Sequence, residues 1–336
     1  MHMADSLITP VVGIGMIAAS AGVMTYSVSK LKENMDEKKI AMMGIMGAFV
    51  FAGQMINFTI PGTGSSGHIG GGLLLAAILG PHAGFVVISA VLIIQAMFFG
   101  DGGLLALGCN IFNMGFYTCF LVYPLIYKPI VTRGLNTRRI TIAAIIAIVA
   151  GLQFGAFSVV IETLASGVTQ LPFRAFVMLM QPIHVAIGLI EGIVTAGILC
   201  FVYAQRPEIL QGAIYNKDLG NNSIKKVAAS LLIMAMIIGG GVSLFASSNP
   251  DGLEWAIFNV SGVEEIESEG RAHEIAQSIQ GKTALMPDYG FKDPEKEGSM
   301  AGTSAAGIAG GFMTLLFAVL GGKLISLGKK HKGASK

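Results

Sequence analysis

The amino-acid sequence predicts an all-α polytopic membrane protein with about nine transmembrane helices, one of them short or broken. Of its 336 residues, 53% are hydrophobic and only 12% are charged, about half the charged share of an ordinary soluble domain. The mean hydropathy is +0.69. Glycine, with 45 residues, is frequent in membrane helices, where small side chains let helices approach closely. This composition excludes a water-soluble globular fold.

Long apolar runs mark the expected spans. A helix that crosses the bilayer needs about 20 mostly apolar residues. The run 70–80 is too short, because at about 1.5 Å per residue it reaches about 16 Å, half of the hydrocarbon core. We expect a short or broken helix there, shielded by neighbouring helices. The longer runs cover 6–29, 40–58, 83–99, 104–127, 140–161, 175–204, 224–246 and 303–322.

The basic residues are distributed unevenly among the loops between these runs. Lys and Arg in short loops remain on the cytoplasmic side of a membrane. If 70–80 counts as a crossing, 17 of the 22 basic residues fall on one side, after the first, fifth, seventh and last spans. If it did not cross, the basic loop 128–139 would fall outside, against the charge rule. The sequence therefore predicts an outside N-terminus and a cytoplasmic C-terminus.

Loop length and polarity divide the chain into three parts. We expect a seven-span membrane domain at 1–204, a polar cytoplasmic linker at 205–224 and a two-span hairpin at 225–336. The loop of the hairpin, about 247–302, carries eleven acidic against four basic residues. Its acidity agrees with a position on the outer side of the membrane.

Two histidines are expected to meet on the outer face. The topology places the start of the chain on the same side as the Gly-rich loop 59–72, which carries His68 and no charged residue. On a metal ion, the Met1 amine and the His2 backbone nitrogen close a five-membered ring, and that nitrogen and the His2 imidazole close a six-membered ring. The His68 imidazole would complete a square of four nitrogens, a geometry diagnostic of Ni(II) or Cu(II).

This chelate has further consequences and two open alternatives. We expect Met1 to be retained, because a bulky second residue such as His2 blocks its enzymatic removal. Metal binding must displace protons from the amine and the amide, so the affinity should fall at acid pH. Taken singly, His2 also fits a frayed chain end and His68 a solvated turn. Their expected meeting on one face favours a metal site.

Other polar residues are candidates for supporting this site or for ordinary packing. A polar group within the membrane is costly and often functional. Asp5 suits an acceptor for the His2 ring or the N-cap of a helix, and the amides suit interhelical hydrogen bonds equally well. In the span 175–204, His184 and Glu191 share one helix face, either as metal-transit groups or as a mutually satisfied pair. The supporting candidates are Asp5, Gln54, Asn57, Ser66, Asn110 and Asn113.

The sequence carries no motif of an enzyme. Gly281-Lys282-Thr283 resembles the end of a phosphate-binding loop, but position 276 is Ala where the motif needs Gly,. Neither HExxH nor GxSxG occurs,. We therefore expect no ATP hydrolysis by this chain itself.

Three stretches of the first half resemble one family. They are Met1-His2-Met3, the loop from Ile60 to His68 with the sequence IPGTGSSGH, and Asn110-x-x-Asn113 followed by Met and Gly. They resemble the CbiM/NikM substrate-capture (S) components of energy-coupling factor (ECF) ABC transporters. The PDGLE stretch at 250–254 resembles the small CbiN/NikN partner, which has two spans and an extracytoplasmic loop. The chain looks like a fusion of both components.

The resemblance implies a function, a ligand set and partners. It implies a subunit in a bacterial or archaeal cell membrane that captures Ni²⁺ or Co²⁺ as substrate, with no permanent cofactor and no nucleic acid. The implied ligands are the Met1 amine, the backbone nitrogen and imidazole of His2, and the His68 imidazole. The implied partners are a transmembrane coupling (T) subunit, cytoplasmic ATPase subunits and membrane lipid. The loop 247–302 would reach over the metal pocket and help loading.

Two other functions compete with this expectation. A stand-alone divalent-metal channel or exporter would need charged groups along a continuous path, for which the spans offer only His184 and Glu191. A membrane enzyme with a His-bound metal would need an acid beside His2 and His68 to act as a base. Neither requirement is evident in the sequence.

Overall fold

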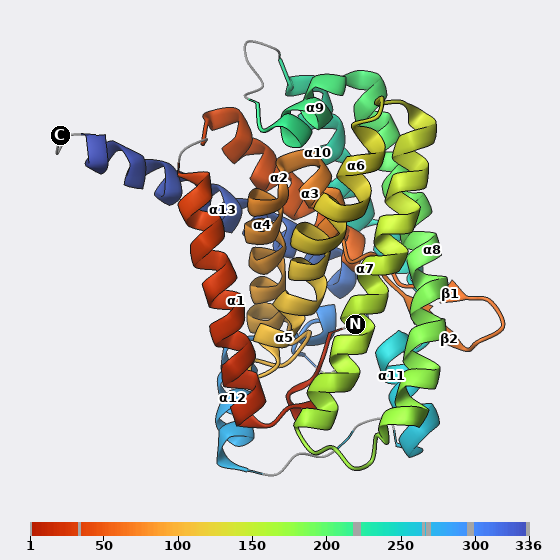
Figure 1. Cartoon of the computed structure of the whole chain (residues 1–336). Coiled ribbons are helices and arrows are strands. Elements are labelled where there is room, and N and C mark those ends of the chain that lie inside the picture. Colours follow the sequence, from red (N-terminus) through yellow and green to blue (C-terminus); the bar gives the residue numbers. More distant parts are fainter. Residues whose placement is uncertain are drawn as a thin grey trace.

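Helices make up most of the molecule, which confirms the predicted fold class at the level of a helical, multi-pass membrane protein. The computed structural model describes residues 2–32, 35–217, 223–263, 266, 270–293 and 299–333. Most of the long helices form a bundle with their axes running in a common direction, whereas the C-terminal helix runs obliquely to them (Figure 1). One short two-stranded hairpin is found alongside them in these ranges.

Within the described part of the chain, six helices are long and apolar enough to cross a membrane. Each corresponds to a predicted run. One begins as α4 (Pro81–Ile94) and continues with π winding as η2 (Gln95–Phe99). Another combines α5 (Leu107–Ile111), η3 (Phe112–Tyr127) and α6 (Lys128–Val131). The other four are α1 (Pro10–Leu31), α7 (Thr137–Ala165), α8 (Phe173–Gln205) and α13 (Met300–Gly333).

Several predicted ends are wrong, because local sequence signals interrupt the apolar runs. The run 6–29 becomes helical only at Pro10, which suits the first helical position, after the 3₁₀ turn η1 (Asp5–Leu7). The run 40–58 forms α2 (Glu37–Gln54) and then turns into a strand. The run 224–246 forms α10 (Lys225–Gly240), which ends at three consecutive glycines before η4 (Val242–Phe245),.

The run 70–80 forms the short helix α3 (Gly72–Leu79). All eight of its residues are buried, so neighbouring helices shield it as predicted. At about 12 Å it is far shorter than the hydrocarbon core. Gly71 and Gly80 bound it with φ of 77° and 85°, a left-handed conformation that glycine adopts without steric cost.

A β-hairpin precedes α3 and positions His68. Strand β1 (Phe58–Ile60) pairs antiparallel with β2 (Ser65–Gly67), with Thr59 opposite Ser66. The other edge of β2 pairs with the C-terminal half of the chain, through a parallel bridge between Ser66 and Asp251. The backbone N–H of Ser66 donates to the Pro250 carbonyl at 2.8 Å. Two distant parts of the sequence therefore fix this hairpin.

The C-terminal half packs along the first half. The segment 205–224 contains the helix α9 (Pro207–Tyr215), which buries Ile209, Leu210 and Ile214. Helices α10 and α13 meet at Gly239 and Gly307, where a Cβ on Gly307 would lie 2.0 Å from the Gly239 carbonyl oxygen. The remaining elements are α11 (Gly252–Ser261), α12 (Arg271–Thr283) and η5 (Pro287–Tyr289).

These last three elements lie at the end of the bundle that also holds the start of the chain (Figure 1). On α11, the Trp255 Nε1–H donates to the Thr63 carbonyl in the β-hairpin turn at 2.9 Å. On α12, the His273 ring contacts the Ile8 carbonyl at 3.0 Å. The chain start, the hairpin and the C-terminal half thus come together at one end of the molecule.

Candidate metal centre

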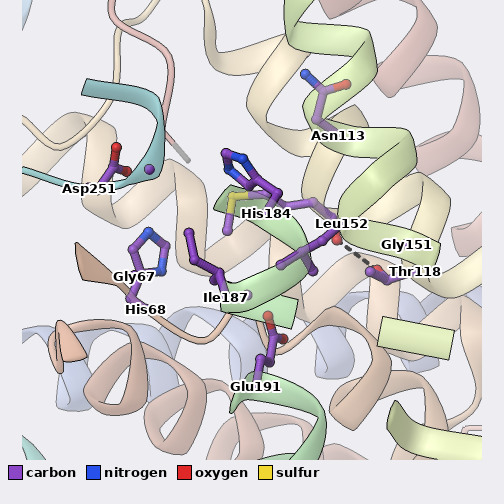
Figure 2. A pocket seen from close by; sticks show the side chains of 13 residues that line it. Gly67, His68, Asn113, Thr118, Gly151, Leu152, His184, Ile187, Glu191 and Asp251 are labelled. Carbon is purple, nitrogen blue, oxygen red and sulfur yellow. Dashed lines mark hydrogen bonds between the residues drawn. The ribbon is translucent and has the colours of Figure 1, made fainter. Parts of the chain in front are cut away.

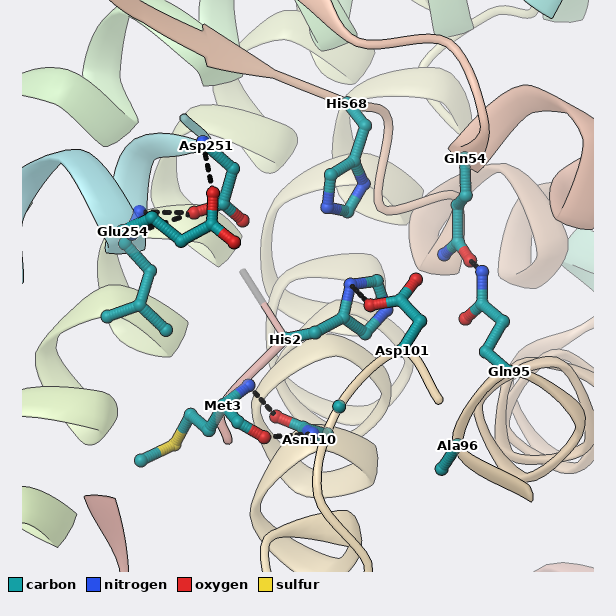
Figure 3. Close-up of polar contacts among 12 residues, drawn as sticks. His2, Met3, Gln54, His68, Gln95, Ala96, Asp101, Asn110, Asp251 and Glu254 are labelled. Carbon is teal, nitrogen blue, oxygen red and sulfur yellow. Dashed lines mark hydrogen bonds and ion pairs between the residues drawn. The ribbon is translucent and has the colours of Figure 1, made fainter. Parts of the chain in front are cut away.

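The N-terminal segment is fixed by hydrogen bonds at Met3. Its backbone N–H donates to Asn110 Oδ1 at 2.8 Å, and Asn110 Nδ2 donates back to the Met3 carbonyl at 3.2 Å (Figure 3). The same carbonyl also accepts from the Gly103 N–H at 2.9 Å. Met3 is completely buried. The residue directly before it, His2, is therefore held at a defined place.

His2 and His68 lie face to face, although 66 positions separate them in the sequence. Their ring centroids are 5.0 Å apart and the ring planes differ by 15°. The structure thus brings the two histidines together. Met1, the third residue of the expected ligand set, lies outside the described residues.

A carboxylate that the sequence reasoning did not single out faces the His2 ring. Asp101 Oδ1 lies 3.3 Å from His2 Nδ1 (Figure 3). Its other oxygen accepts a hydrogen bond from the Tyr289 hydroxyl at 2.5 Å. A signal was present in the sequence, since Asp101 is the one acid in the Gly-rich turn 100–103. This turn falls on the same predicted face as His68.

The His68 imidazole is held in a tautomer that offers Nε2 to a metal ion, and both histidine rings are neutral. His68 Nδ1 lies 3.1 Å from the Ile69 carbonyl. Because a carbonyl oxygen can only accept, Nδ1 carries the proton and the lone pair is on Nε2. Burial lowers the pKa of His68 to about 3 and also lowers the pKa of His2. Both rings are therefore neutral near pH 7, as metal coordination requires.

The side chains of the described residues do not form a conventional metal-binding cluster. No three His, Cys, Asp or Glu side chains within the described ranges form a group that could hold a metal ion. The imidazoles of His2 and His68 instead form a stacked pair, with one carboxylate, Asp101, beside the His2 ring.

Two of the predicted supporting residues organise the loops around the rings. Asp5 Oδ1 accepts from the backbone N–H groups of Leu105 and Ala106 at 2.7 and 3.0 Å. The carboxylate observed beside the His2 ring is that of Asp101. Gln54 donates to the Gly70 carbonyl at 2.8 Å and accepts from Gln95 Nε2 at 2.8 Å.

The other supporting candidates join separate elements of the fold. The Ser66 hydroxyl donates to the Asn249 carbonyl at 2.8 Å, and the Asn57 carbonyl accepts from the Ser247 N–H at 2.7 Å. Both contacts join the β-hairpin to the C-terminal half. Asn113 Nδ2 donates to Glu162 Oε2 on α7 at 2.8 Å, an interhelical hydrogen bond of the kind that the sequence left open.

A cavity extends from His68 into the bundle (Figure 2). It is lined by residues of β2, η3, α7, α8 and the start of α11. His184 and Glu191 both line it. They do not form the mutually satisfied pair that the sequence left open, because His184 Nδ1 contacts the Met180 carbonyl and Glu191 Oε1 accepts from the Gly71 N–H.

Comparisons with known proteins identify the family of this chain. The family described as the cobalt uptake substrate-specific transmembrane region (CbiM) matches residues 2–209, and the PDGLE domain matches residues 225–327. A protein of Archaeoglobus fulgidus that carries the name fused nickel transport protein NikMN is 30% identical over 94% of this chain and 96% of its own length.

Two further relatives cover mainly the first half. The fused nickel transport protein NikMN of Rhodobacter capsulatus is 33% identical over 62% of this chain and 64% of its own length. A crystal structure of a truncated transition metal transporter has a TM-score of 0.54 and 30% identity, covering 61% of this chain and 99% of that one. The chain therefore belongs to the CbiM family of nickel and cobalt transport membrane proteins, as a CbiM/NikM-type component fused to a CbiN-like PDGLE domain.

Proposed function

We propose that this protein is the substrate-binding membrane subunit of an ECF-type ABC importer. It captures divalent nickel or cobalt at the extracytoplasmic face for ATP-driven uptake. The observation that carries the proposal is the stacking of His2 on His68 at 5.0 Å, at the end of the bundle where the chain begins. Membership in a nickel and cobalt transport family supports it.

The proposed donors are four nitrogens. They are the Met1 amine, the backbone nitrogen and imidazole of His2, and the imidazole of His68. The Met3–Asn110 hydrogen bonds support this assignment, because they hold the chelating segment against the bundle before any ion arrives. In-plane nitrogen donors that include an amide suit Ni(II), and the affinity order places Co(II) below it.

The proposed topology has nine crossings, with the N-terminus outside and the C-terminus in the cytoplasm. The three helices α2, α3 and α10 would then cross together with the six longer ones. Their burial among neighbouring helices supports this, since α3 is buried throughout and α2 is buried along most of its length. We further propose the domain division 1–204, 205–224 and 225–336.

The proposed partners are a transmembrane coupling subunit and a pair of cytoplasmic ATPases. The sequence supports this proposal, because the stretch that ends in Gly281-Lys282-Thr283 has Ala at position 276, where a phosphate-binding loop needs its first glycine,. The alternative is a stand-alone divalent-metal channel or exporter. The cavity beside His68, which His184 and Glu191 help to line, is the observation that favours it.

Nickel titration of the purified full chain with a native N-terminus tests the proposal. We expect one ion per chain and the optical spectrum of a square-planar, diamagnetic nickel complex. A chain with one residue added before Met1 should lose this complex, because the amine is displaced from the chelate. His68→Ala should also lose it with the fold intact. Nickel binding that is indifferent to both changes would refute the proposed site.

Uptake of nickel separates the proposal from the alternative. Cells that hold the chain together with coupling and ATPase subunits should accumulate nickel, and cells that hold the chain alone should not. Accumulation by the chain alone would favour the channel. The direction of transport is read from the same measurement.

A further inference from the structure

The proposed chelate requires one particular nitrogen of the His2 ring. Its six-membered ring consists of the His2 backbone nitrogen, Cα, Cβ, Cγ, Nδ1 and the metal ion, so the lone pair that binds the ion must be on Nδ1. A neutral imidazole carries one proton, on either nitrogen, and the hydrogen bond that one nitrogen donates leaves the other free for a metal. The tautomer of His2 therefore decides whether the ring is ready for the ion.

Two buried side-chain amides lead from the loop of His68 toward His2. Gln54, the last residue of α2, is 5% exposed, and Gln95, the first residue of η2, is 0% exposed. Gln54 Nε2 donates to the Gly70 carbonyl at 2.8 Å. Gln95 Nε2 in turn donates to Gln54 Oε1 at 2.8 Å (Figure 3). This amide relay begins at the backbone two residues after His68.

The direction of the relay is fixed at Gly70. A backbone carbonyl can only accept, so the Gln54 atom that faces it is the nitrogen. The oxygen of Gln54 therefore faces Gln95, and the Gln95 atom that faces this oxygen is again the nitrogen. Gln95 Oε1 remains as a buried acceptor without a hydrogen bond of normal geometry among the described residues. Figure 3 shows this oxygen turned away from Gln54, toward the side of His2.

The His2 ring supplies a matching donor. His2 Nε2 is likewise buried without a hydrogen bond of normal geometry in the described part of the chain. Burial lowers the pKa of His2, whereas a side-chain hydrogen bond with Gln95 raises it. An acceptor next to an imidazole has this effect, because it favours the protonated ring. Gln95 therefore offers its oxygen to the N–H of His2.

The other ring nitrogen faces a carboxylate. His2 Nδ1 lies 3.3 Å from Asp101 Oδ1, which is longer than the about 2.7–2.9 Å of a charge-assisted N–H···O⁻ bond. The Tyr289 hydroxyl donates to the other oxygen of Asp101. A lone pair on Nδ1 and the charge of Asp101 together attract a cation. A proton on Nδ1 would have to leave before a metal ion could bind there.

We propose that Gln54 and Gln95 are positioning residues that fix the tautomer of His2, with the proton on Nε2 and the lone pair on Nδ1. The inference rests on the proposed function, since it concerns the nitrogen that the proposed chelate uses. The loop that carries one imidazole thereby sets the proton of the other. In the competing arrangement, Nδ1 donates its proton to Asp101, and Nε2 and Gln95 Oε1 are left as two buried acceptors without a donor.

The tautomer is read directly by ¹⁵N NMR of the purified full chain with labelled histidine and without metal. The signals of His2 are identified by their loss in His2→Ala. We expect a protonated Nε2 and an unprotonated Nδ1. A native chain with the proton on Nδ1 overturns the inference. This measurement needs no nickel, so it still decides the inference if the native chain fails to bind nickel and the proposed function is refuted.

Gln95→Met removes the acceptor and keeps the length of the side chain. We expect His2 with a protonated Nδ1 to appear in this variant, and nickel affinity to fall by about tenfold. Gln153→Met is the matched control, because the Gln153 amide donates to the Gln181 carbonyl at 3.0 Å and joins α7 to α8, neither of which carries His2. The control should keep the native tautomer and the native affinity.

Each remaining outcome is also decisive. An unchanged tautomer in Gln95→Met overturns the inference, whatever the affinity does. A changed tautomer with native nickel affinity means that the tautomer does not govern capture, which refutes the positioning role. Equal changes in Gln153→Met would assign the effect to general packing and refute it as well. If Gln95→Met does not fold, the tautomer of the native chain decides alone.

Discussion

Asn110 holds the N-terminal segment that carries the proposed metal ligand His2. Its amide accepts from the Met3 N–H at 2.8 Å and donates to the Met3 carbonyl at 3.2 Å. Asn110 is 2% exposed and Met3 is 0% exposed, so solvent does not reach these groups in the folded chain. We predict that Asn110→Ala weakens nickel binding, because His2 loses its fixed position beside His68.

The size of this effect follows from the two hydrogen bonds. The Met3 carbonyl keeps its second bond, from the Gly103 N–H at 2.9 Å. The Met3 N–H is left without that partner, and a buried unpaired donor costs about 1–3 kcal/mol. If the binding-competent conformation of the N-terminal segment is destabilised by about 2 kcal/mol, nickel binding becomes about 30-fold weaker.

Isothermal titration of the untagged chain with Ni²⁺ measures this loss. Ser20→Ala is the matched control, because the Ser20 hydroxyl donates to the Gly108 carbonyl at 2.7 Å and is equally buried, at 3% exposure, between α1 and α5. The control variant should bind nickel as the native chain does. If Asn110→Ala also binds with native affinity, the claim that this amide positions the chelate is refuted.

Three further predictions concern protonation, charge and packing. Burial lowers the pKa of His68 to about 3, so protons do not compete with the metal ion for this imidazole above that pH. The fall in nickel affinity from about pH 8 to about pH 5 should therefore reflect protonation of the Met1 amine and the His2 amide nitrogen. An inflection near the ordinary histidine value of about 6.5 would contradict this. Asp101→Asn should weaken nickel binding by about tenfold, because a carboxylate 3.3 Å from His2 Nδ1 attracts the dication,. Nickel titration at low salt measures this loss, and an unchanged affinity would contradict the attraction. Gly307→Ala should lower the melting temperature by several degrees, since its Cβ would lie 2.0 Å from the Gly239 carbonyl oxygen. A Cβ on Gly281 would meet no atom within 4 Å, so Gly281→Ala should leave the melting temperature unchanged. Equal melting temperatures of the two variants would contradict the close packing of α10 on α13.

Apolar run length was a good guide to helices but a poor one to their ends. Hydropathy reports where a segment prefers lipid or protein interior, and this preference continues past the last helical residue. The run 40–58 stays apolar while the backbone leaves α2 at Gln54 and enters β1 at Phe58. Only backbone signals such as the glycines after α10 mark these ends, and they are weak in a Gly-rich membrane chain.

The meeting of His2 and His68 followed from topology, because alternating crossings bring alternate loops to one face. Topology sorts residues by side but gives no position within that side. It therefore did not distinguish Asp5 from Asp101 as the carboxylate that faces His2. The choice depends on the backbone of 101–106, where two N–H groups already occupy Asp5 Oδ1.

The position of His68 depends on the C-terminal half of the chain as well as on its own. Strand β2 has two edges, and β1 occupies one of them. The backbone at 249–251 occupies the other: the Ser66 N–H donates to the Pro250 carbonyl and the Ser66 hydroxyl to the Asn249 carbonyl, both at 2.8 Å. His68 follows Ser66 by two residues, so the hairpin cannot carry this imidazole away from His2 without breaking those bonds. Tyr289 holds Asp101 from the same half of the chain. Contacts from the PDGLE domain thus reach both sides of the histidine pair, so this domain helps to fix the candidate metal centre.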